Sequence, residues 1–458
     1  MSLRNKLAVI CLVMGCWCHF ALAQNLEFSV SPTPVGSGAR AAGMADAFVA
    51  VADDATAASW NPAGLVQLER PELSIVGELT ALEEEFSSSR HRETNSSHHD
   101  DAHELNYFSL VYPLPVLIGD RNASVSLNYQ RKYDFNRQFG IRYNLRGTGL
   151  NAAYSRYNFD YEQDGGLSAL TPAVAMELTQ RLSVGVSVNF WRSSLFDDND
   201  WEQHVETHVF SQFGDLSVVS RNEIIEKYED FSGENITLGV LWNVFDKWNV
   251  GLRYDSSFEG EAEYTYWEFG YDVGLPTLSY PVFMPAAYAR VESEDRHLRF
   301  PASLALGAAY RPNDRLTVSL DITQTDWNEF YYKNGRGHRF SLVNGMSTNT
   351  APDFDKTKTV RLGAEYLFLP KQPDETLKRL WSLRGGLFYD EEPASREPDS
   401  FYGFALGAGL QTHQRVNLDV AYQLRYGDDV NEDLISGIDD FQEDVLQHRF
   451  LFSTVIYF

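Results

Sequence analysis

The stretch GSGARAAGMADAFVAVADDATAASWNPAGL, residues 36–65, decides how the rest of the chain is interpreted. Half of its thirty residues are Ala or Gly, so it has too little side-chain volume to build a hydrophobic core of its own. Small residues do allow a backbone to approach another surface closely. The stretch ends in WNPAG, residues 60–64, whose Asn, Pro and Gly are typical of a turn. It therefore predicts a plug that packs inside a cylinder formed by the rest of the chain.

The first residues have the layout of a secretory signal peptide. Arg4 and Lys6 precede an apolar run that closes in ALA, residues 21–23, so we expect cleavage after Ala23. Lipoprotein processing at Cys16 is an alternative, because residues 13–16 partly match a lipidation box. All three cysteines precede residue 24, so cleavage leaves a mature chain without cysteine. A disulfide-stapled extracellular scaffold is thereby excluded.

Alternation of apolar and polar residues dominates the chain beyond the plug. Clear examples are LSVGVSVNF (182–190), LTVSLDIT (316–323) and VNLDVAYQLR (416–425). Successive side chains of a strand point to opposite faces, so each segment has one apolar and one polar face. The pattern predicts fourteen strands: 72–86, 103–114, 121–135, 166–178, 181–196, 233–244, 247–259, 298–311, 315–328, 356–369, 379–390, 400–411, 414–426 and 446–458.

Strand length and loop length favour a membrane barrel over a soluble β-sandwich. Most predicted strands exceed the ~5–6 residues of soluble strands and approach the ~10 that cross a bilayer. Short connections alternate with long ones, and the long set is 87–102, 136–165, 197–232, 260–297, 329–355, 391–399 and 427–445. Short turns on one side and long loops on the other are typical of outer-membrane barrels. An even strand count also places the hatch and the C-terminus on the same, periplasmic side. An aromatic content of 14% is consistent with aromatic girdles.

The predicted fold is therefore all-β: a transmembrane antiparallel barrel of about 14 strands with an N-terminal hatch that plugs its lumen. We expect a signal peptide at 1–23, the hatch at 24–70 and the barrel at 71–458. Lipid offers no partner to an open sheet edge, so the strands must close. A barrel of this size is too wide for its own side chains to fill, which is why a plug is needed. The chain ends in an alternating strand with a terminal Phe458.

The plug stretch resembles the N-terminal hatch of the FadL/TodX family of outer-membrane transport proteins for hydrophobic compounds. Its hatch motif, Asn61, Pro62 and Ala63, matches that family position by position. Further similarities are FPA (300–302), LGAAYRP (306–312), GLFYD (386–390) and PDS (398–400). The resemblance implies a ligand-docking groove near an outer loop and lateral release into the membrane at a kinked third strand. The predicted third strand, 121–135, contains no glycine to mark such a kink.

Apolar spacing changes in the third and fourth long connections. Trp201 begins a series that recurs every four residues, and a shorter series follows, which predicts two amphipathic helices between Leu195 and Phe231. Aromatic residues crowd the connection at 260–297 and are expected to form a second wall. The candidate ligand groove is Trp201, Val205, Val209, Phe213, Ile224, Tyr228, Trp267 and Phe269. A simple cap on the barrel remains the alternative interpretation of these residues.

These features predict passive uptake of hydrophobic small molecules, either long-chain fatty acids or aromatic or aliphatic hydrocarbons. The expected location is the outer membrane of a Gram-negative bacterium, with multiple crossings by a monomer that contacts lipid and lipopolysaccharide. A formal charge of −26 argues against nucleic acid. Two alternatives remain: a structural or secretion-associated barrel that anchors surface proteins, and an open porin for polar solutes.

No catalytic or cofactor site is expected. The chain has no Gly-x-Ser-x-Gly, His-Glu-x-x-His or phosphate-binding glycine motif, so we expect no enzyme. Histidines and aspartates between His91 and His103 fit no defined metal spacing and are interpreted as a solvated loop. The hypothesis therefore involves no cofactor and no metal.

Overall fold

The structure is a computed structural model that describes residues 37–114, 121–146, 154–194, 198–213, 216–275, 286–340, 354–370, 379–394, 397–431 and 440–458. The predicted signal peptide and the beginning of the predicted hatch lie outside these ranges. Within them, no helix is both long and apolar enough to cross a membrane. The helical elements are short: α2 (Ala39–Gly43), α3 (Ala57–Trp60), η1 (Pro62–Gln67), η2 (Arg92–Thr94) and η3 (Trp327–Glu329).

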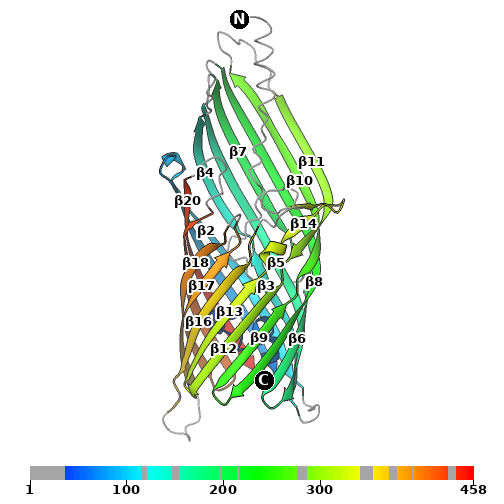
Figure 1. Cartoon of the computed structure of the whole chain (residues 1–458), viewed down its shortest axis with the longest axis vertical. Coiled ribbons are helices and arrows are strands. Elements are labelled where there is room, and N and C mark those ends of the chain that lie inside the picture. Colours follow the sequence, from blue (N-terminus) through cyan, green and yellow to red (C-terminus); the bar gives the residue numbers. More distant parts are fainter. Residues whose placement is uncertain are drawn as a thin grey trace, which may run out of the picture.

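Fourteen strands close into one antiparallel barrel, which confirms the predicted fold class (Figure 1). In ring order they are β1 (Glu72–Ser88), β2 (Ser96–Pro113), β3 (Ala123–Asp134), β5 (Tyr154–Thr179), β6 (Leu182–Trp191), β8 (Leu216–Phe245), β9 (Trp248–Asp255), β12 (Ser303–Asn313), β13 (Leu316–Thr325), β16 (Thr357–Leu367), β17 (Arg379–Glu392), β18 (Asp399–Thr412), β19 (Val416–Val430) and β20 (Phe441–Tyr457). Each strand pairs with the next, and β20 pairs with β1. Closure supplies the backbone partners that lipid lacks.

The barrel wall carries its apolar side chains on the outside. In β13, Leu320 and Ile322 are 44% and 47% exposed, whereas the alternating Ser319 and Asp321 are buried. A soluble sheet has the opposite arrangement, because its apolar face packs on a core. The outer surface of the wall is therefore suited to lipid, and the interior of the barrel is polar.

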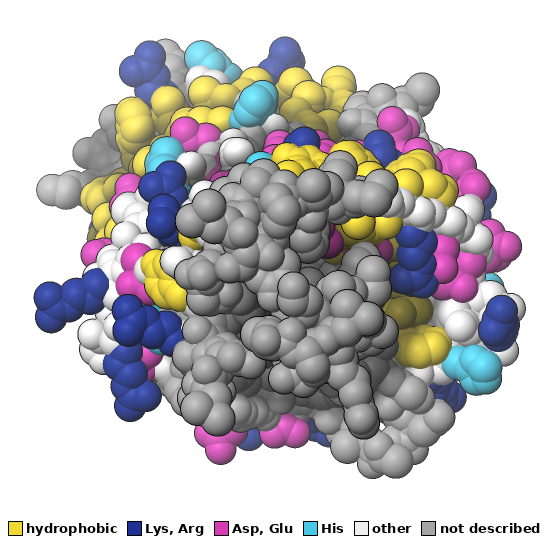
Figure 2. Space-filling view, turned by 90° about the horizontal axis from the view of Figure 1, so that it is seen from above, with side chains coloured by type: hydrophobic (Ala, Val, Ile, Leu, Met, Phe, Trp, Pro, Cys, Tyr) yellow, Lys and Arg dark blue, Asp and Glu magenta, His cyan; other side chains and the backbone are white. Residues whose placement is uncertain are grey.

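A second sheet continues beyond one end of the barrel (Figure 1). β5 and β8 belong to both sheets, because each is long enough to run from one into the other. The remaining strands of this outer sheet are β4 (Arg137–Arg146), β7 (Trp201–Phe213), β10 (Phe258–Leu275), β11 (Ala286–Phe300), β14 (Tyr331–Lys333) and β15 (Arg339–Phe340). Seen from this end, side chains of both charge signs surround the molecule (Figure 2).

The two amphipathic helices predicted between Leu195 and Phe231 are wrong, because this region contains β7 and the first half of β8. Apolar residues four apart share one face of a helix, but they also share one face of a strand, since four is a multiple of two. The extended form prevails here because β5 and β10 supply backbone partners on either side. The predicted long loops at 136–165 and 260–297 are likewise largely strand.

The described part of the predicted hatch is 37–70, and residues 37–68 of it lie inside the barrel. Met44, Phe48 and Leu65 have no exposed surface. Their apolar cluster includes wall residues from separate parts of the ring, such as Val111 in β2 and Ala309 in β12. The small-residue segment therefore obtains from the barrel the core that it cannot build alone.

Candidate functional site

Pairs of glycines in the barrel wall form the surface on which the hatch is seated. Three pairs lie directly opposite each other on neighbouring strands: Gly185 with Gly239, Gly251 with Gly307, and Gly363 with Gly386. A Cβ atom on Gly239 would lie 2.8 Å from Cδ of Pro62, and one on Gly363 would lie 2.8 Å from Cβ of Met44. Such separations are well inside van der Waals contact, so even a methyl group would displace the hatch.

The Asn-Pro-Ala motif fixes the C-terminal end of the hatch, which continues into β1. Nδ2 of Asn61 donates to the carbonyl of Val49 at 2.9 Å and to the carbonyl of Val240 in β8 at 3.0 Å. Its Oδ1 accepts from the amide of Ala63 at 3.2 Å, which caps η1, and Pro62 occupies the first turn of that helix. One side chain thus joins two parts of the hatch to the wall.

A buried group of mainly aromatic side chains lies above the hatch, where the barrel meets the outer sheet. This inner aromatic cluster consists of Tyr133, Phe135, Leu167, Ala169, Trp191, Trp201, Tyr228, Phe231, Phe258, Ala262, Tyr264, Leu298, Phe300, Trp327, Phe330 and Phe354. Stacked rings run through it: Trp191 and Phe258 have centroids 5.1 Å apart, and Trp201 and Tyr228 are 4.4 Å apart. Such offset contacts add to the gain from burial alone.

A second aromatic cluster lies further out, between the outer sheet and the upper ends of β1 and β20. This outer aromatic cluster consists of Phe86, Phe139, Ile141, Tyr143, Tyr161 and Phe441. Val205 of β7 packs against it, while Trp201 of the same strand belongs to the inner cluster. The two clusters therefore follow one face of β7 from the outer sheet towards the barrel.

Five of the eight predicted groove residues lie on this inner face of the outer sheet. Trp201 is paired with Tyr228 across β7 and β8, and Val205 is paired with Ile224. Val209 follows on the same face of β7, because alternate side chains of a strand share a face. The sequence therefore placed these residues together, although by a helical argument that the structure contradicts.

The structure separates two other predicted groove residues from this set. Trp267 and Phe269 of β10 pair with Ile225 and Glu223 of β8, which alternate with the inner-face residues. Trp267 and Phe269 therefore project from the opposite face of the sheet, where Phe269 is 41% exposed. The side chain of Phe213, at the end of β7, lies outside the described part of the structure.

Charged groups lie at the outer edge of the inner cluster. The guanidinium carbon of Arg296 is 3.2 Å from the ring centre of Tyr264 and 4.3 Å from that of Tyr332. Glu226 is buried beside them and accepts a hydrogen bond from Tyr264. Burial raises the pKa of Glu226 above the usual carboxyl range, because the charged form loses its hydration.

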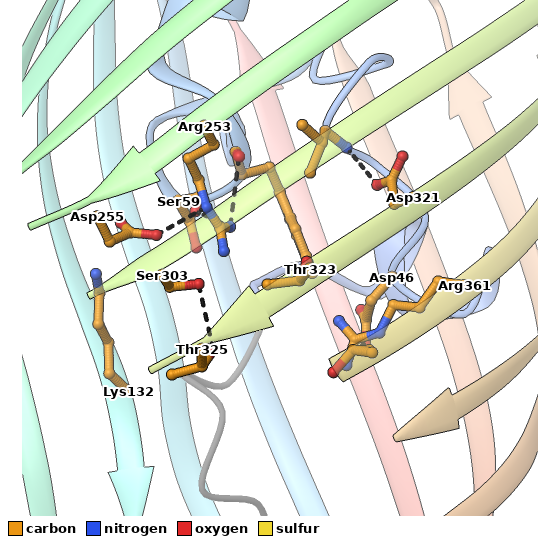
Figure 3. Close-up of a pocket in the computed structure, with 13 residues that line it drawn as sticks. Asp46, Ser59, Lys132, Arg253, Asp255, Ser303, Asp321, Thr323, Thr325 and Arg361 are labelled. Carbon is orange, nitrogen blue, oxygen red and sulfur yellow. Dashed lines mark hydrogen bonds and ion pairs between the residues drawn. The ribbon is translucent and has the colours of Figure 1, made fainter. Parts of the chain in front are cut away.

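A polar pocket separates the inner aromatic cluster from the hatch (Figure 3). It is lined by Asp46, Val49, Ser59, Trp60, Lys132, Arg253, Asp255, Ser303, Asp321, Thr323, Thr325, Thr359 and Arg361. Three wall side chains of the pocket contact the hatch directly. Asp321 accepts from the amide of Val49 at 2.7 Å, Arg253 donates to the carbonyl of Ser59 at 3.3 Å, and Arg361 lies 4.0 Å from the carboxylate of Asp46. The hatch thus forms the floor of a pocket whose walls belong to the barrel.

Lys132 is the unusual member of this pocket. Its Nζ lies 3.5 Å from Oδ1 of Asn189 and 5.6 Å from the ring centre of Trp191, which belongs to the inner cluster. Arg253 pairs with Asp255 at 2.9 Å, whereas the hydrogen-bond partner of Lys132 among the described residues is the amide oxygen of Asn189 rather than a carboxylate. The buried ammonium group of Lys132 therefore lies between the polar pocket and the inner aromatic cluster.

The wall is split between β2 and β3 at the level of the inner cluster. The two strands pair only from Tyr107 with Gln130 down to Pro113 with Ser124, whereas β2 continues upwards along β1. β3 is irregular between Arg131 and Tyr133, where its pairing with β5 shifts. The third barrel strand is therefore distorted without the glycine that a kink was expected to need.

Polar side chains bridge this split. Arg131 of β3 forms an ion pair with Glu104 of β2 and a second with Asp134 at 3.3 Å. Nearby, Nδ2 of Asn106 donates to Glu78 at 2.7 Å. Together with Thr80 and Ala102, these residues line a small pocket at the split.

Of the histidines assigned to the first outer loop, His98, His99 and His103 take separate positions along β2, and His91 precedes η2. The ring of His98 packs against Phe86, with centroids 5.2 Å apart, and Nε2 of His99 lies 3.2 Å from Asp101. In the described ranges, no group of three or more His, Cys, Asp and Glu side chains is arranged to hold a metal ion.

A closed barrel with a lipid-compatible wall and an internal hatch defines the class of plugged outer-membrane channels. The family model described as outer membrane protein transport protein (OMPP1/FadL/TodX) matches residues 28–439. The chain belongs to this family.

Solved structures of the family share the fold at low sequence identity. A FadL homologue of Pseudomonas aeruginosa is 16% identical, with a TM-score of 0.54 over 93% of this chain and 99% of that one. The Pseudomonas putida toluene transporter TodX is 13% identical, with a TM-score of 0.55 over 94% and 99%. The Ralstonia pickettii toluene transporter TbuX is 14% identical, with a TM-score of 0.52 over 92% and 98%. A comparison with curated protein sequences finds no match.

The paired wall glycines on which the hatch rests, here called the glycine seat, can be tested by substitution, with an adjacent glycine as the control. Replacing Gly386, where a Cβ would lie 2.7 Å from Cβ of Ala45, with Val is expected to destabilise the protein by about 1–3 kcal/mol through overpacking. Gly385, where the nearest atom is 3.7 Å away, should accept Val with a much smaller effect. Urea unfolding in lipid vesicles, followed by tryptophan fluorescence, measures both variants. Equal losses at the two positions would contradict the seat.

Proposed function

We propose that this chain is a passive outer-membrane channel for hydrophobic small molecules, such as long-chain fatty acids or aromatic or aliphatic hydrocarbons. The observation that carries the proposal is the succession of aromatic clusters along the inner face of the outer sheet, which ends directly above the hatch. An apolar ligand gains about 25 cal/mol for each Å² that it removes from water in such surroundings. Family membership and the similar structures that are described as toluene transporters support the same class of ligand.

The proposed route turns sideways at the inner cluster. A ligand would dock on the outer aromatic cluster, pass to the inner cluster, and leave through the split between β2 and β3 into the membrane. The polar pocket and the seated hatch below oppose a straight path, because an apolar molecule gains nothing from charged surroundings. Flow would be driven by partition into lipid and by removal of the ligand on the inner side.

Two tryptophans on opposite faces of the outer sheet test the docking surface. Trp201→Ala is expected to weaken saturable binding of oleate or toluene roughly tenfold, because a lost buried aromatic contact is worth about 1.4 kcal/mol. Trp267→Ala, on the other face, should leave binding unchanged. Equilibrium binding of radiolabelled ligands to the purified proteins measures the difference.

The outcome also separates the alternative functions. Equal loss in the two tryptophan variants would contradict the inner-face route. Failure of the parent protein to bind any member of a broad hydrophobic panel, together with co-purification of a surface protein, would favour the anchoring barrel. The outer sheet that projects beyond the barrel offers such a partner a surface (Figure 1).

Lys132 provides a test of ligand chemistry. Lys132→Met is expected to weaken oleate binding at least roughly tenfold, because a hydrogen bond to a charged group contributes about 1.5–3 kcal/mol. Binding of toluene, which has no charge to satisfy, should be unchanged. Lys247→Met, in an exposed turn, serves as the control. If Lys132→Met leaves the ratio of the oleate and toluene affinities at its parental value, Lys132 has no part in ligand recognition.

A reversible cross-link tests the lateral exit. All three cysteines of the sequence precede residue 24, within the predicted signal peptide, so Glu104→Cys with Arg131→Cys can be joined by a short bifunctional thiol reagent that spans the two contacting side chains. Uptake of a labelled ligand into cells should stop when the split is closed and return after reduction. A control pair, Tyr112→Cys with Val125→Cys, links positions that are already paired and should leave uptake unchanged. Undiminished uptake with the split cross-linked would rule out this exit.

A further inference from the structure

One arginine joins the N-terminal half of the hatch to the barrel wall. Arg40 of α2 donates through Nε and Nη2 to both carboxylate oxygens of Glu365 in β16, at 2.9 and 2.8 Å. Its Nη1 also lies 2.6 Å from Asp53 and 3.5 Å from Asp54, further along the hatch. A planar guanidinium is suited to such bidentate pairing, which fixes orientation as well as distance.

The ion pairs of Arg40 continue into the wall on both sides. Glu365 is also paired with Arg384 of β17 at 2.8 Å, and Arg384 with Asp419 of β19 at 2.6 Å. Asp53 is also paired with Arg311 of β12 at 2.8 Å. A chain of alternating charges thus connects the hatch to four strands, and Arg40 is its central cation.

The other end of the hatch is held in a different way. It continues covalently into β1, and hydrogen bonds fix it to the wall, including those of Asn61, the bond from Ser183 to the carbonyl of Ala63 at 3.1 Å and the bond from Arg253 to the carbonyl of Ser59 at 3.3 Å. Besides Arg40, the N-terminal half is bonded to the wall mainly through charged groups: Asp321 accepts from the amide of Val49 at 2.7 Å, and Gln423 donates to Asp46 at 3.1 Å as well as to the carbonyl of Ala42 at 3.0 Å. The C-terminal end of the hatch is therefore a fixed pivot, whereas the N-terminal half depends on charge.

We propose that Arg40 is the latch that keeps the hatch seated. Without it, the carboxylates of Asp53, Asp54 and Glu365 face one another without the cation that they share, and like charges in confined surroundings repel. The N-terminal half of the hatch then leaves the glycine seat, turns about the Asn61 end and opens the lumen. The use of this opening in uptake rests on the proposed function, but the latch itself can be tested without any ligand.

Ion conductance in planar lipid bilayers measures the latch directly. The parent protein is expected to conduct no ions, whereas Arg40→Ala should show ion-conducting steps. Arg40→Lys should show a smaller conductance, because it keeps the charge but loses the bidentate geometry of the guanidinium. The matched control is Arg181→Ala, which removes an exposed ion pair with Asp246 on a barrel turn and should remain silent. A parent protein that conducts without ligand would overturn the latch and favour an open porin.

A cross-linked variant keeps the test valid if Arg40→Ala does not assemble. Arg40→Cys with Glu365→Cys is joined by a reversible thiol reagent and reconstituted in the linked form. Linked protein should be silent and the same protein should conduct after reduction. Silence after reduction, with the folded barrel confirmed by its heat-modifiable gel mobility, would overturn the proposal, as would conductance while linked. Conductance that appears on reduction in a protein that binds no hydrophobic ligand would retain the latch and reject the proposed function.

Discussion

Close contact between the backbone of the hatch and the backbone of the barrel wall is the interaction on which the rest of the structure depends. A closed ring of fourteen strands satisfies its own hydrogen bonds but leaves a bore that its side chains do not fill. The hatch, being largely Ala and Gly, has no core to order it and would lose conformational entropy without compensation if it stood alone. Opposed glycines in the wall remove the steric barrier between the two, so each part completes the other.

The interior of the barrel is divided into two chemical zones by this arrangement. Above the hatch, rings such as Trp191, Phe258 and Phe300 offer a ligand dispersion contacts and exclude water. At the level of the hatch, ion pairs such as that between Arg384 and Asp419 replace them. Under the proposed function, a hydrophobic molecule would be attracted as far as the inner cluster and no further along the axis. The split between β2 and β3 lies at the height where this attraction would end, which gives the proposed lateral route its physical rationale.

The sequence was sufficient for the barrel because strand alternation is a local property. The alternating residues around Leu320 and Val420 can be recognised without knowledge of any partner strand. The outer sheet could not be predicted in the same way, because the spacing from Trp201 to Val209 fits a helix and a strand equally well. Only the presence of β5 and β10 beside this segment decides between them.

Other features of the site depended on register, which a single sequence does not contain. Aromatic content groups Trp267 with Trp201, yet a shift of one residue along a strand places a side chain on the opposite face. The wall glycines could be noticed in the sequence, because Gly185 and Gly239 each lie between two apolar residues of a predicted strand. Their direct opposition is a property of pairing alone. The distortion of β3 near Arg131 could not be predicted, because no glycine or proline in that strand indicates it.

The charges inside the barrel supply positional information that small side chains cannot. A surface of Ala and Gly is nearly featureless, so it would fit a smooth wall in several neighbouring registers with similar energy. Paired buried charges add little net stability, since desolvation offsets most of their attraction, but a misplaced charge is strongly unfavourable. The pairing of Arg40 with Glu365 and the bonds of Asn61 to β8 therefore select one register from those that packing alone would allow. The small side chains of the hatch therefore allow it to pack closely against the wall, and its few polar groups fix its position there.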